Sequence, residues 1–236
     1  MTITSSDNPK LKQIRRLSQR RRAREATSRF VAEGEDLLCA ADAAGWTPVE
    51  RYVASGSGLA GTEVEPRLLA AASELGSGTR ALGVYEERWA PAALGPLGVC
   101  LYGVADPGNV GTILRCAAAF GAASVAIGPG TADPYGPKAV RASMGAVFTV
   151  PLARVGEPAA LPGPTVALQS GEGRPLHELE LPEATYLVGA ERGGLPAEVV
   201  AAADLIARIP IATDSLNAAM AATIALYEAT RMRRGS

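Results

Sequence analysis

Three short stretches of the chain combine helix starts or tight turns with polar side chains that could hold a ligand. In DPGNVGTILR, Asn109 and Arg115 lie around the expected start of a helix. GAERGGLP is a glycine-dense turn that carries Glu191. IPIATDSLN places Ser215 and Asn217 at the start of an almost uncharged helix. Free backbone N–H groups at helix starts suit a carboxylate or an electron-rich ring. The three stretches therefore predict a site that holds a reactive cofactor.

Each of these side chains also has a purely structural interpretation. Arg115 is the one charged residue of a helix made of small and apolar groups, so it either meets an anionic or polar partner or lies along the surface. Glu191 could be an ordinary exposed turn residue. Ser215 and Asn217 suit the start of the last helix, and Asn109 is the predicted N-cap of its own helix.

Several other chemistries find no support in the composition. His177 is the only histidine, so zinc sites built on several histidines are excluded, and we expect this residue to be structural or exposed. Cys39, Cys100 and Cys116 form no C-x-x-C pair, which is typical of a reducing compartment. The start MTITSSDNPK lacks an apolar signal core, and no stretch approaches the ~20 apolar residues of a membrane span. We expect a cytoplasmic protein without a metal or a membrane contact.

GSGLAG, at residues 56–61, matches the dinucleotide-binding pattern G-x-G-x-x-G. The residues that follow, TEVEP, do not start an apolar helix that could receive a pyrophosphate. A nucleotide-dependent oxidoreductase is therefore an alternative with weak support, and a loop is the preferred interpretation.

A basic block lies near the start of the chain. Residues 10–29 hold nine Lys or Arg and one acid, although the formal net charge of the whole chain is −1. Such a block favours a polyanion partner, the alternative being a solvated helix face. The residues of this block that we expect to contact the polyanion are Arg15, Arg16, Arg20, Arg21, Arg22 and Arg24.

Two α/β regions are predicted, with a Pro/Gly-rich linker between them. Residues 1–92 are the first domain and residues 97–236 the second. In the first, we expect helices over 5–29, about 34–45 and 65–75 and strands near 30–33, 48–55 and 78–87. In the second, apolar strands alternate with helices, which indicates a parallel sheet covered on both faces. The expected strands are 98–104, 123–128, 147–152, 165–170, 185–190 and 206–211, and the expected helices are 110–120, 138–146 and 215–233.

In this order and at strand ends, the three stretches resemble the motifs of the SpoU/TrmH family of AdoMet-dependent RNA ribose 2′-O-methyltransferases, part of the SPOUT superfamily. Each is similar to one family pattern: N-x-x-G-x-x-x-R, G-x-E-x-x-G and I-P…S-L-N. The residues that match are Asn109, Gly111 and Arg115; Gly189, Glu191 and Gly194; Ile209, Pro210, Ser215, Leu216 and Asn217. KAVRASMGA, with Arg141, resembles the stretch after the first motif. The first domain, with SSDNPKLKQIRRL and FVAEGEDLL, looks like the small RNA-binding domain that precedes such catalytic domains in members that act on 23S ribosomal RNA.

The resemblance implies a trefoil-knotted catalytic domain and a homodimer with its site at the interface. It implies that backbone near one set of residues holds AdoMet: Leu168, Gln169, Gly189, Ala190, Gly194, Ile209, Ile211 and Leu216. It assigns Arg115 to the 2′-hydroxyl or the adjoining phosphate, with Asn109, Glu191, Ser215 and Asn217 holding that Arg, the ribose and the cofactor. Arg141 would join the basic block in binding RNA.

One departure from the family pattern leaves alternatives open. Only ATD joins IPI to SLN, without the glycine and the longer loop that are common in the family. A non-catalytic RNA-binding protein with a closed cofactor pocket is therefore one alternative. Transfer RNA in place of 23S ribosomal RNA is another.

Overall fold

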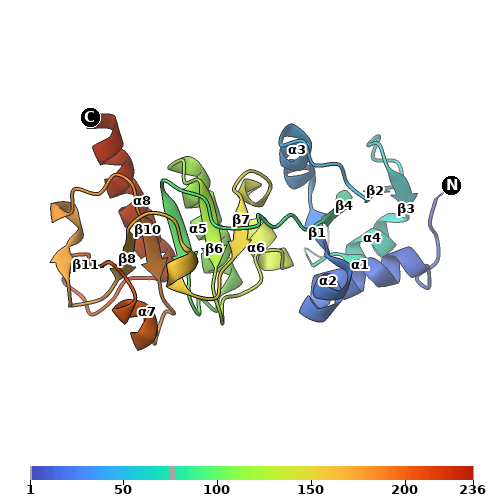
Figure 1. Cartoon of the computed structure of the whole chain (residues 1–236). Coiled ribbons are helices and arrows are strands. Elements are labelled where there is room, and N and C mark those ends of the chain that lie inside the picture. The colour runs from blue at the N-terminus through green and yellow to red at the C-terminus, as the bar shows by residue number, and fades with distance from the viewer. Residues whose placement is uncertain (1, 75–77, 236) are drawn as a thin grey trace. The chain divides into compact units, whose positions relative to one another are not determined.

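The computed structural model describes residues 2–74 and 78–235, and its contacts divide the chain into two compact units (Figure 1). The first unit comprises Met1–Glu87 together with Asp133–Phe148, and the second comprises Arg88–Ala132 and Thr149–Ser236. No helix in the described ranges has the length and apolar content needed to cross a membrane.

A four-stranded sheet forms the centre of the first unit. Its order is β1-β4-β2-β3, with strands Arg29–Glu33, Ala81–Glu86, Glu50–Ala54 and Thr62–Val64. The helices are α1 Pro9–Gln19, α2 Arg21–Thr27, α3 Glu35–Ala43 and α4 Pro66–Ala72. Leu11, Ile14 and Leu17 recur on the buried face of α1 and join the core of this unit, as the helical spacing predicts.

The helix predicted over 5–29 is two helices. Arg20 has extended backbone angles (φ −126°, ψ 112°), which end α1 and start α2. The helix predicted over 65–75 ends at Ala72, and its last predicted residue lies outside the described ones. The strand Thr62–Val64 follows GSGLAG directly, so this glycine run is a loop between two parallel strands. A strand, and not a helix, follows the glycine run, so no helix N-terminus is placed there to bind the phosphates that the oxidoreductase alternative requires.

Arg24 is buried in the first unit, which corrects its expected role as a surface RNA contact. Its side chain is 6% exposed, and its Nε lies 2.7 Å from Asp133 Oδ2. Its Nη1 donates a 2.6 Å hydrogen bond to the carbonyl of Leu17. Because the guanidinium is already satisfied inside the unit, Arg24 is not available to an RNA phosphate.

Residues 133–148 pack with the N-terminal sheet, although the predicted second domain included them. Phe30 lies 4.7 Å from Tyr135 and 6.0 Å from Phe148, measured between ring centroids. Trp46 Nε1 donates a 2.8 Å hydrogen bond to the carbonyl of Phe148. The chain therefore leaves the second unit at Asp133 and returns to it at Thr149. The two units defined by contacts differ in this respect from the predicted domains 1–92 and 97–236, whose boundary stays a prediction.

We predict that Arg24→Ala lowers the free energy of unfolding by about 3–5 kcal/mol, because Asp133 would be left as a buried charge without its partner. Urea denaturation measures this loss. Arg22→Ala, which removes an exposed arginine of the same helix, should change stability by no more than about 0.5 kcal/mol. Equal effects of the two substitutions would contradict the structural role of Arg24.

The second unit is built on a parallel seven-stranded sheet in the order β7-β6-β5-β10-β8-β11-β9. Its strands, in chain order from β5 to β11, are Gly98–Leu101, Ser124–Ile127, Leu152–Arg154, Thr165–Leu168, Arg174–Pro175, Thr185–Val188 and Leu205–Arg208. Its helices are α5 Pro107–Ala119, α7 Ala197–Ala201 and α8 Ala218–Gly235. α8 packs against α5 and β10. The parallel α/β architecture predicted from the sequence is confirmed.

Several boundaries differ from the prediction. The helix predicted over 138–146 is α6, Pro137–Ala142, and it lies in the first unit. The strand predicted over 147–152 begins later than expected. A 3-10 turn occupies Ala146–Phe148, and β7 starts only at Leu152. β9 was not predicted, because two residues carry no periodicity. The last helix begins at Ala218, three residues after the predicted start at Ser215.

Candidate active site

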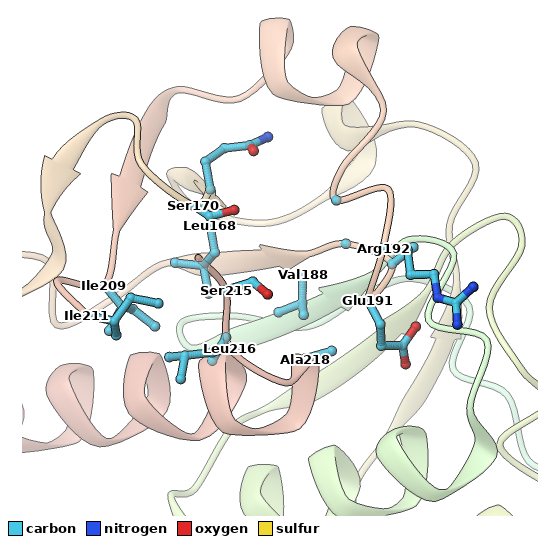
Figure 2. Close-up of a pocket in the computed structure, with 15 residues that line it drawn as sticks. Leu168, Ser170, Val188, Glu191, Arg192, Ile209, Ile211, Ser215, Leu216 and Ala218 are labelled. Atoms are coloured by element: carbon cyan, nitrogen blue, oxygen red, sulfur yellow. The ribbon is translucent and has the colours of Figure 1, made fainter. Parts of the chain in front are cut away.

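A pocket lies at the carboxyl ends of β8, β10 and β11, beside the start of α8 (Figure 2). Its empty volume is about 810 Å³ with the open mouth included. Ligands bind parallel α/β sheets at this edge. The residues that line it are Leu168, Gln169, Ser170, Val188, Gly189, Ala190, Glu191, Arg192, Gly194, Ile209, Ile211, Ser215, Leu216, Ala218 and Ala221.

The two ends of the pocket differ in chemistry. Ile209, Ile211 and Leu216 lie at one end, and Glu191 and Arg192 lie at the other (Figure 2). The short connection over residues 212–214 does not close the pocket, because those residues are exposed and are not among its lining. A ligand could therefore place an apolar ring between the isoleucines and a charged group near the glutamate.

The turn after β10 is closed by two backbone hydrogen bonds. Ala190 N donates to the carbonyl of Gly194 (3.0 Å), and Gly194 N donates to the carbonyl of Ala190 (2.9 Å). A Cβ on Gly189 would lie 2.2 Å from the carbonyl carbon of Gly194, and Gly194 itself has φ +65°. Both glycines are thus required by the shape of the turn, which presents Glu191 at the pocket.

A chain of hydrogen bonds joins the three polar stretches. Asn109 Nδ2 donates to Glu191 Oε1 (2.7 Å), and Asn217 Nδ2 donates to Asn109 Oδ1 (3.0 Å). The Oδ1 of Asn217 accepts from the backbone N–H groups of Ala219 (2.9 Å) and Met220 (3.3 Å). Residues 82 and 108 positions apart in the sequence therefore form one network, which holds the Glu191 carboxylate and the start of α8 in place.

The N-cap of α5 is Asp106, so the expectation that Asn109 caps this helix was wrong. Asp106 Oδ1 accepts a 2.9 Å hydrogen bond from Gly108 N. Pro107 occupies the first helical position, where its missing N–H costs nothing. This earlier start moves Asn109 inside the helix and leaves its amide free to bridge Glu191 and Asn217.

The structure brings the other two predicted catalytic residues to different places. Ser215 is exposed and lines the pocket without joining the hydrogen-bonded chain. Arg115 is exposed on α5, and within the described part of the chain no ion pair or hydrogen bond of its side chain is found. Arg115 is therefore positioned as a surface guanidinium, not as a buried one held by a partner.

All eight residues predicted to hold the cofactor line this one pocket. The prediction missed five further lining residues: Ser170, Val188, Arg192, Ala218 and Ala221. Val188 and Ser170 directly adjoin predicted positions. Their place at the ends of the predicted strands was the signal that could have identified them as pocket residues. Arg192 follows Glu191 in the turn, and only the direction of the turn brings it to the pocket.

The thiols and the histidine do not contribute to the site. Burial raises the pKa of Cys100 to about 12, so this β5 thiol stays protonated at neutral pH. His177 is exposed beside Glu178, with 3.9 Å between Nε2 and Oε1. Across residues 2–74 and 78–235, no three His, Cys, Asp or Glu side chains gather closely enough to hold a metal ion.

The predicted RNA-binding arginines other than Arg24 remain at or near the surface. Arg16, Arg20 and Arg22 are exposed, and so is Arg141, which lies in the N-terminal unit. Arg21 is also exposed and pairs with Glu25 at 2.8 Å. Arg15 is half-buried, with its Nη1 3.5 Å from the carbonyl of Ser6. These residues can reach a polyanion without unfolding the unit.

Two family models match the chain. Residues 96–227 match the SpoU rRNA Methylase family, and residues 8–87 match the MRM3-like substrate binding domain. The chain is 36% identical over 153 residues to the 23S rRNA (uridine(2479)-2′-O)-methyltransferase of Streptomyces viridochromogenes, which covers 58% of this chain and 53% of that protein. It is 40% identical over 148 residues to a protein named uncharacterized tRNA/rRNA methyltransferase of Mycobacterium tuberculosis, which covers 56% and 50%. The alignments thus span about half the length of these curated relatives.

Among solved structures, the chain is similar to an AdoMet-bound rRNA methyltransferase from Sinorhizobium meliloti. The TM-score is 0.86 and the identity 32%, and the match covers 98% of this chain and 97% of the other. The similarity includes both units of the chain.

Proposed function

The chain belongs to the SpoU rRNA methylase family, and on that premise we propose that it transfers the methyl group of AdoMet to a ribose 2′-hydroxyl of RNA. One observation carries the proposal: the second and third stretches line one pocket, and the Glu191–Asn109–Asn217 hydrogen bonds join the first stretch to both of them. We propose 23S ribosomal RNA as the substrate, because the relative from Streptomyces viridochromogenes is named for that RNA.

The lining of the pocket fits AdoMet. Ile209, Ile211 and Leu216 offer apolar surface for an adenine ring. Glu191 supplies a carboxylate at the opposite end, where a cationic group gains from a nearby negative charge. When bound, AdoMet carries a methyl group already activated by a positively charged sulfur.

The residues of the chain then orient the reacting groups. Asn109 and Asn217 fix Glu191 through their side-chain amides. Arg115, exposed and always charged, would hold the 2′-hydroxyl or the adjoining phosphate by hydrogen bonding. A guanidinium keeps its proton in proteins and is therefore a poor base, so we assign Arg115 to orientation and charge stabilisation. Holding two reactants in line is worth up to about 7–11 kcal/mol in intramolecular reactions.

The exposed arginines of the N-terminal unit would bind RNA phosphates. We predict that the double substitution Arg20→Ala and Arg22→Ala weakens RNA binding and lowers the slope of log K against log salt by about 1.4–1.8, since each phosphate contact contributes roughly 0.7–0.9. Fluorescence anisotropy over a salt series measures both quantities. The matched control removes Arg67 and Arg80, which lie in the same unit and pair with Glu65 and Glu35. Equal slopes for the two double variants would show that the block is only a solvated surface.

We also propose a homodimer whose interface includes the exposed apolar face of α8. Met220 is 60% exposed and Tyr227 is 53% exposed, and both lie on α8, whose residues Ala218 and Ala221 line the pocket. Met220 and Ile224 border a groove that also includes Asn109 and Asn217, so the face is continuous with the candidate site. A second copy is the occupant we propose, because the resemblance places the family's site at a subunit interface. Exposed Arg115 would then find its partners across that interface.

Met220→Glu should convert the dimer to a monomer of about 24 kDa, because a charge would replace an apolar contact in the interface. Sedimentation velocity measures the mass. Met144→Glu is the matched control, since Met144 is also 60% exposed but lies in the other unit. A wild-type chain that sediments as a monomer at micromolar concentration would overturn the dimer.

The knot and the location of the enzyme are part of the same proposal. We propose that α8 passes through a loop, which is supported by the insertion of β10 between β5 and β8 and by the packing of α8 on α5 and β10. We place the reaction in the cytoplasm, on the ground that the proposed substrate is ribosomal RNA.

Calorimetric titration of the full chain with AdoMet tests the proposed cofactor. We expect saturable binding at one site per chain. A non-catalytic RNA-binding protein would give no heat and would overturn the proposal. Methylation of transfer RNA in place of 23S ribosomal RNA, measured with the same preparation, would overturn the substrate.

A further inference from the structure

Two adjacent residues carry the charges of the pocket in the second unit. Among the described residues that line it, Glu191 is the only acid and Arg192 the only base. Both lie in the turn after β10, and Figure 2 shows them at the same end of the pocket, opposite Ile209 and Ile211. A ligand that fills the pocket therefore meets both signs of charge at that end.

The turn fixes the backbone around Arg192 and leaves its side chain available. The hydrogen bonds between Ala190 and Gly194 close the turn on both sides of residues 191–193. Arg192 is exposed, and its guanidinium has neither an ion pair nor a hydrogen bond in the part of the chain that the structure describes. A guanidinium has five N–H donors in a planar fork. All of these donors can bind an anion.

Glu191 and Arg192 do not neutralise each other, since no ion pair joins them within the described residues. The Glu191 carboxylate is held instead by Asn109, whose Nδ2 donates to its Oε1 at 2.7 Å. An isolated anion bound to Arg192 would be repelled by this neighbouring carboxylate. A ligand that carries a cationic group beside its anionic group gains from both residues.

The amino-acid end of AdoMet carries this pair of charges, because its carboxylate and its ammonium are attached to one carbon atom. The planar fork of arginine matches a carboxylate, to which it can donate two parallel hydrogen bonds. The phosphates of RNA bring negative charge alone, so they fit this end of the pocket less well. The family pattern G-x-E-x-x-G leaves the position of Arg192 open, so this arginine is a property of the chain itself.

We propose that Arg192 binds the α-carboxylate of AdoMet and thereby selects ligands that carry the complete amino-acid end. The inference rests on the proposed function for the presence of AdoMet. It assigns a cofactor contact to a lining residue that the sequence motifs did not single out.

Calorimetric titration of the full chain with AdoMet and with decarboxylated AdoMet tests the contact. The two ligands share the adenosine, the sulfonium and an ammonium group, so their comparison isolates the carboxylate. We expect the wild-type chain to bind AdoMet roughly tenfold more tightly, as hydrogen bonds between charged groups provide. Arg192→Gln should reduce this preference to less than about threefold by weakening AdoMet alone. Arg192→Lys should keep part of the preference, because lysine retains the charge without the fork.

Arg174→Gln is the matched control. Arg174 is an exposed arginine of the same unit, lies on β9 and is not among the residues that line the pocket. This variant should keep the wild-type preference, and thermal melting verifies that every variant is folded.

Two results would overturn the inference: a wild-type chain that binds both ligands equally, or a preference that persists in Arg192→Gln. If the preference persists while Arg192→Gln weakens RNA binding, the guanidinium serves RNA and the inference is wrong. Each of these results leaves AdoMet binding by the wild-type chain intact. Failure of the proposed function would appear instead as a wild-type chain that does not bind AdoMet.

Discussion

Replacing Arg115 with alanine should lower methyl transfer by roughly 10²–10³-fold, the loss typical of removing one group that stabilises developing charge. AdoMet binding should stay within twofold of wild type, because Arg115 is not among the residues that line the pocket. The guanidinium is exposed on α5 and has no side-chain partner in the described chain, so its removal should not unfold the protein. Single-turnover methylation and calorimetry on the same preparation separate the two effects.

Arg115→Lys and Arg67→Ala are the controls for this experiment. Lysine keeps the charge but lacks the planar fork of donors, so Arg115→Lys should recover only part of the activity. Arg67 is an exposed arginine of the N-terminal unit, and its loss should leave single-turnover methylation unchanged. Wild-type turnover by Arg115→Ala would remove this residue from the mechanism.

Gly189→Ala should abolish AdoMet binding, with a loss of at least about 100-fold. The added Cβ would lie 2.2 Å from the carbonyl carbon of Gly194 and 2.3 Å from Leu195 N, both backbone atoms. The turn must open to relieve this clash, which breaks the two hydrogen bonds between Ala190 and Gly194. Opening costs several kcal/mol, and each 1.4 kcal/mol is a factor of ten in affinity. Calorimetric titration with AdoMet measures the loss.

The same turn supplies a matched control. A Cβ on Gly193 would meet no atom within 4 Å, and Gly193 is not among the glycines with positive φ. Gly193→Ala should therefore bind AdoMet within about threefold of wild type. If both alanine variants bind normally, the turn after β10 does not shape the cofactor pocket.

The architecture of the second unit could be predicted because its signals are local. Apolar strands and amphipathic helices alternate, and such sequences form parallel sheets with ligand-binding loops at the carboxyl strand ends. The loops after Leu168, Val188 and Arg208 consequently had to meet at one edge of the sheet. This is why the eight predicted cofactor residues line a single pocket, although their roles there stay a prediction.

What the sequence did not predict depends on contacts between distant residues. Arg24 looks like any other arginine of the basic block, and its burial depends on Asp133, which is 109 residues away. The placement of Asp133–Phe148 in the N-terminal unit depends on the aromatic cluster around Phe30. Local periodicity predicts the elements but contains no information on which sheet they join.

The roles of individual side chains in the polar network could not be predicted from the sequence either. Asn109, Glu191 and Asn217 were each singled out, but each also had an ordinary structural interpretation. Asn217 has both roles, because its Oδ1 accepts from two backbone N–H groups of α8 while its Nδ2 donates to Asn109. A capping residue and a functional residue can therefore be the same residue, and only the geometry distinguishes the parts of its side chain.

Incubation of the purified chain with methyl-labelled AdoMet and 23S ribosomal RNA, followed by nucleoside analysis, tests the central claim most directly. We predict one labelled 2′-O-methylnucleotide in that RNA and its loss with Arg115→Ala. Label on a base instead of a ribose, or no label from a chain that binds AdoMet, would contradict the account.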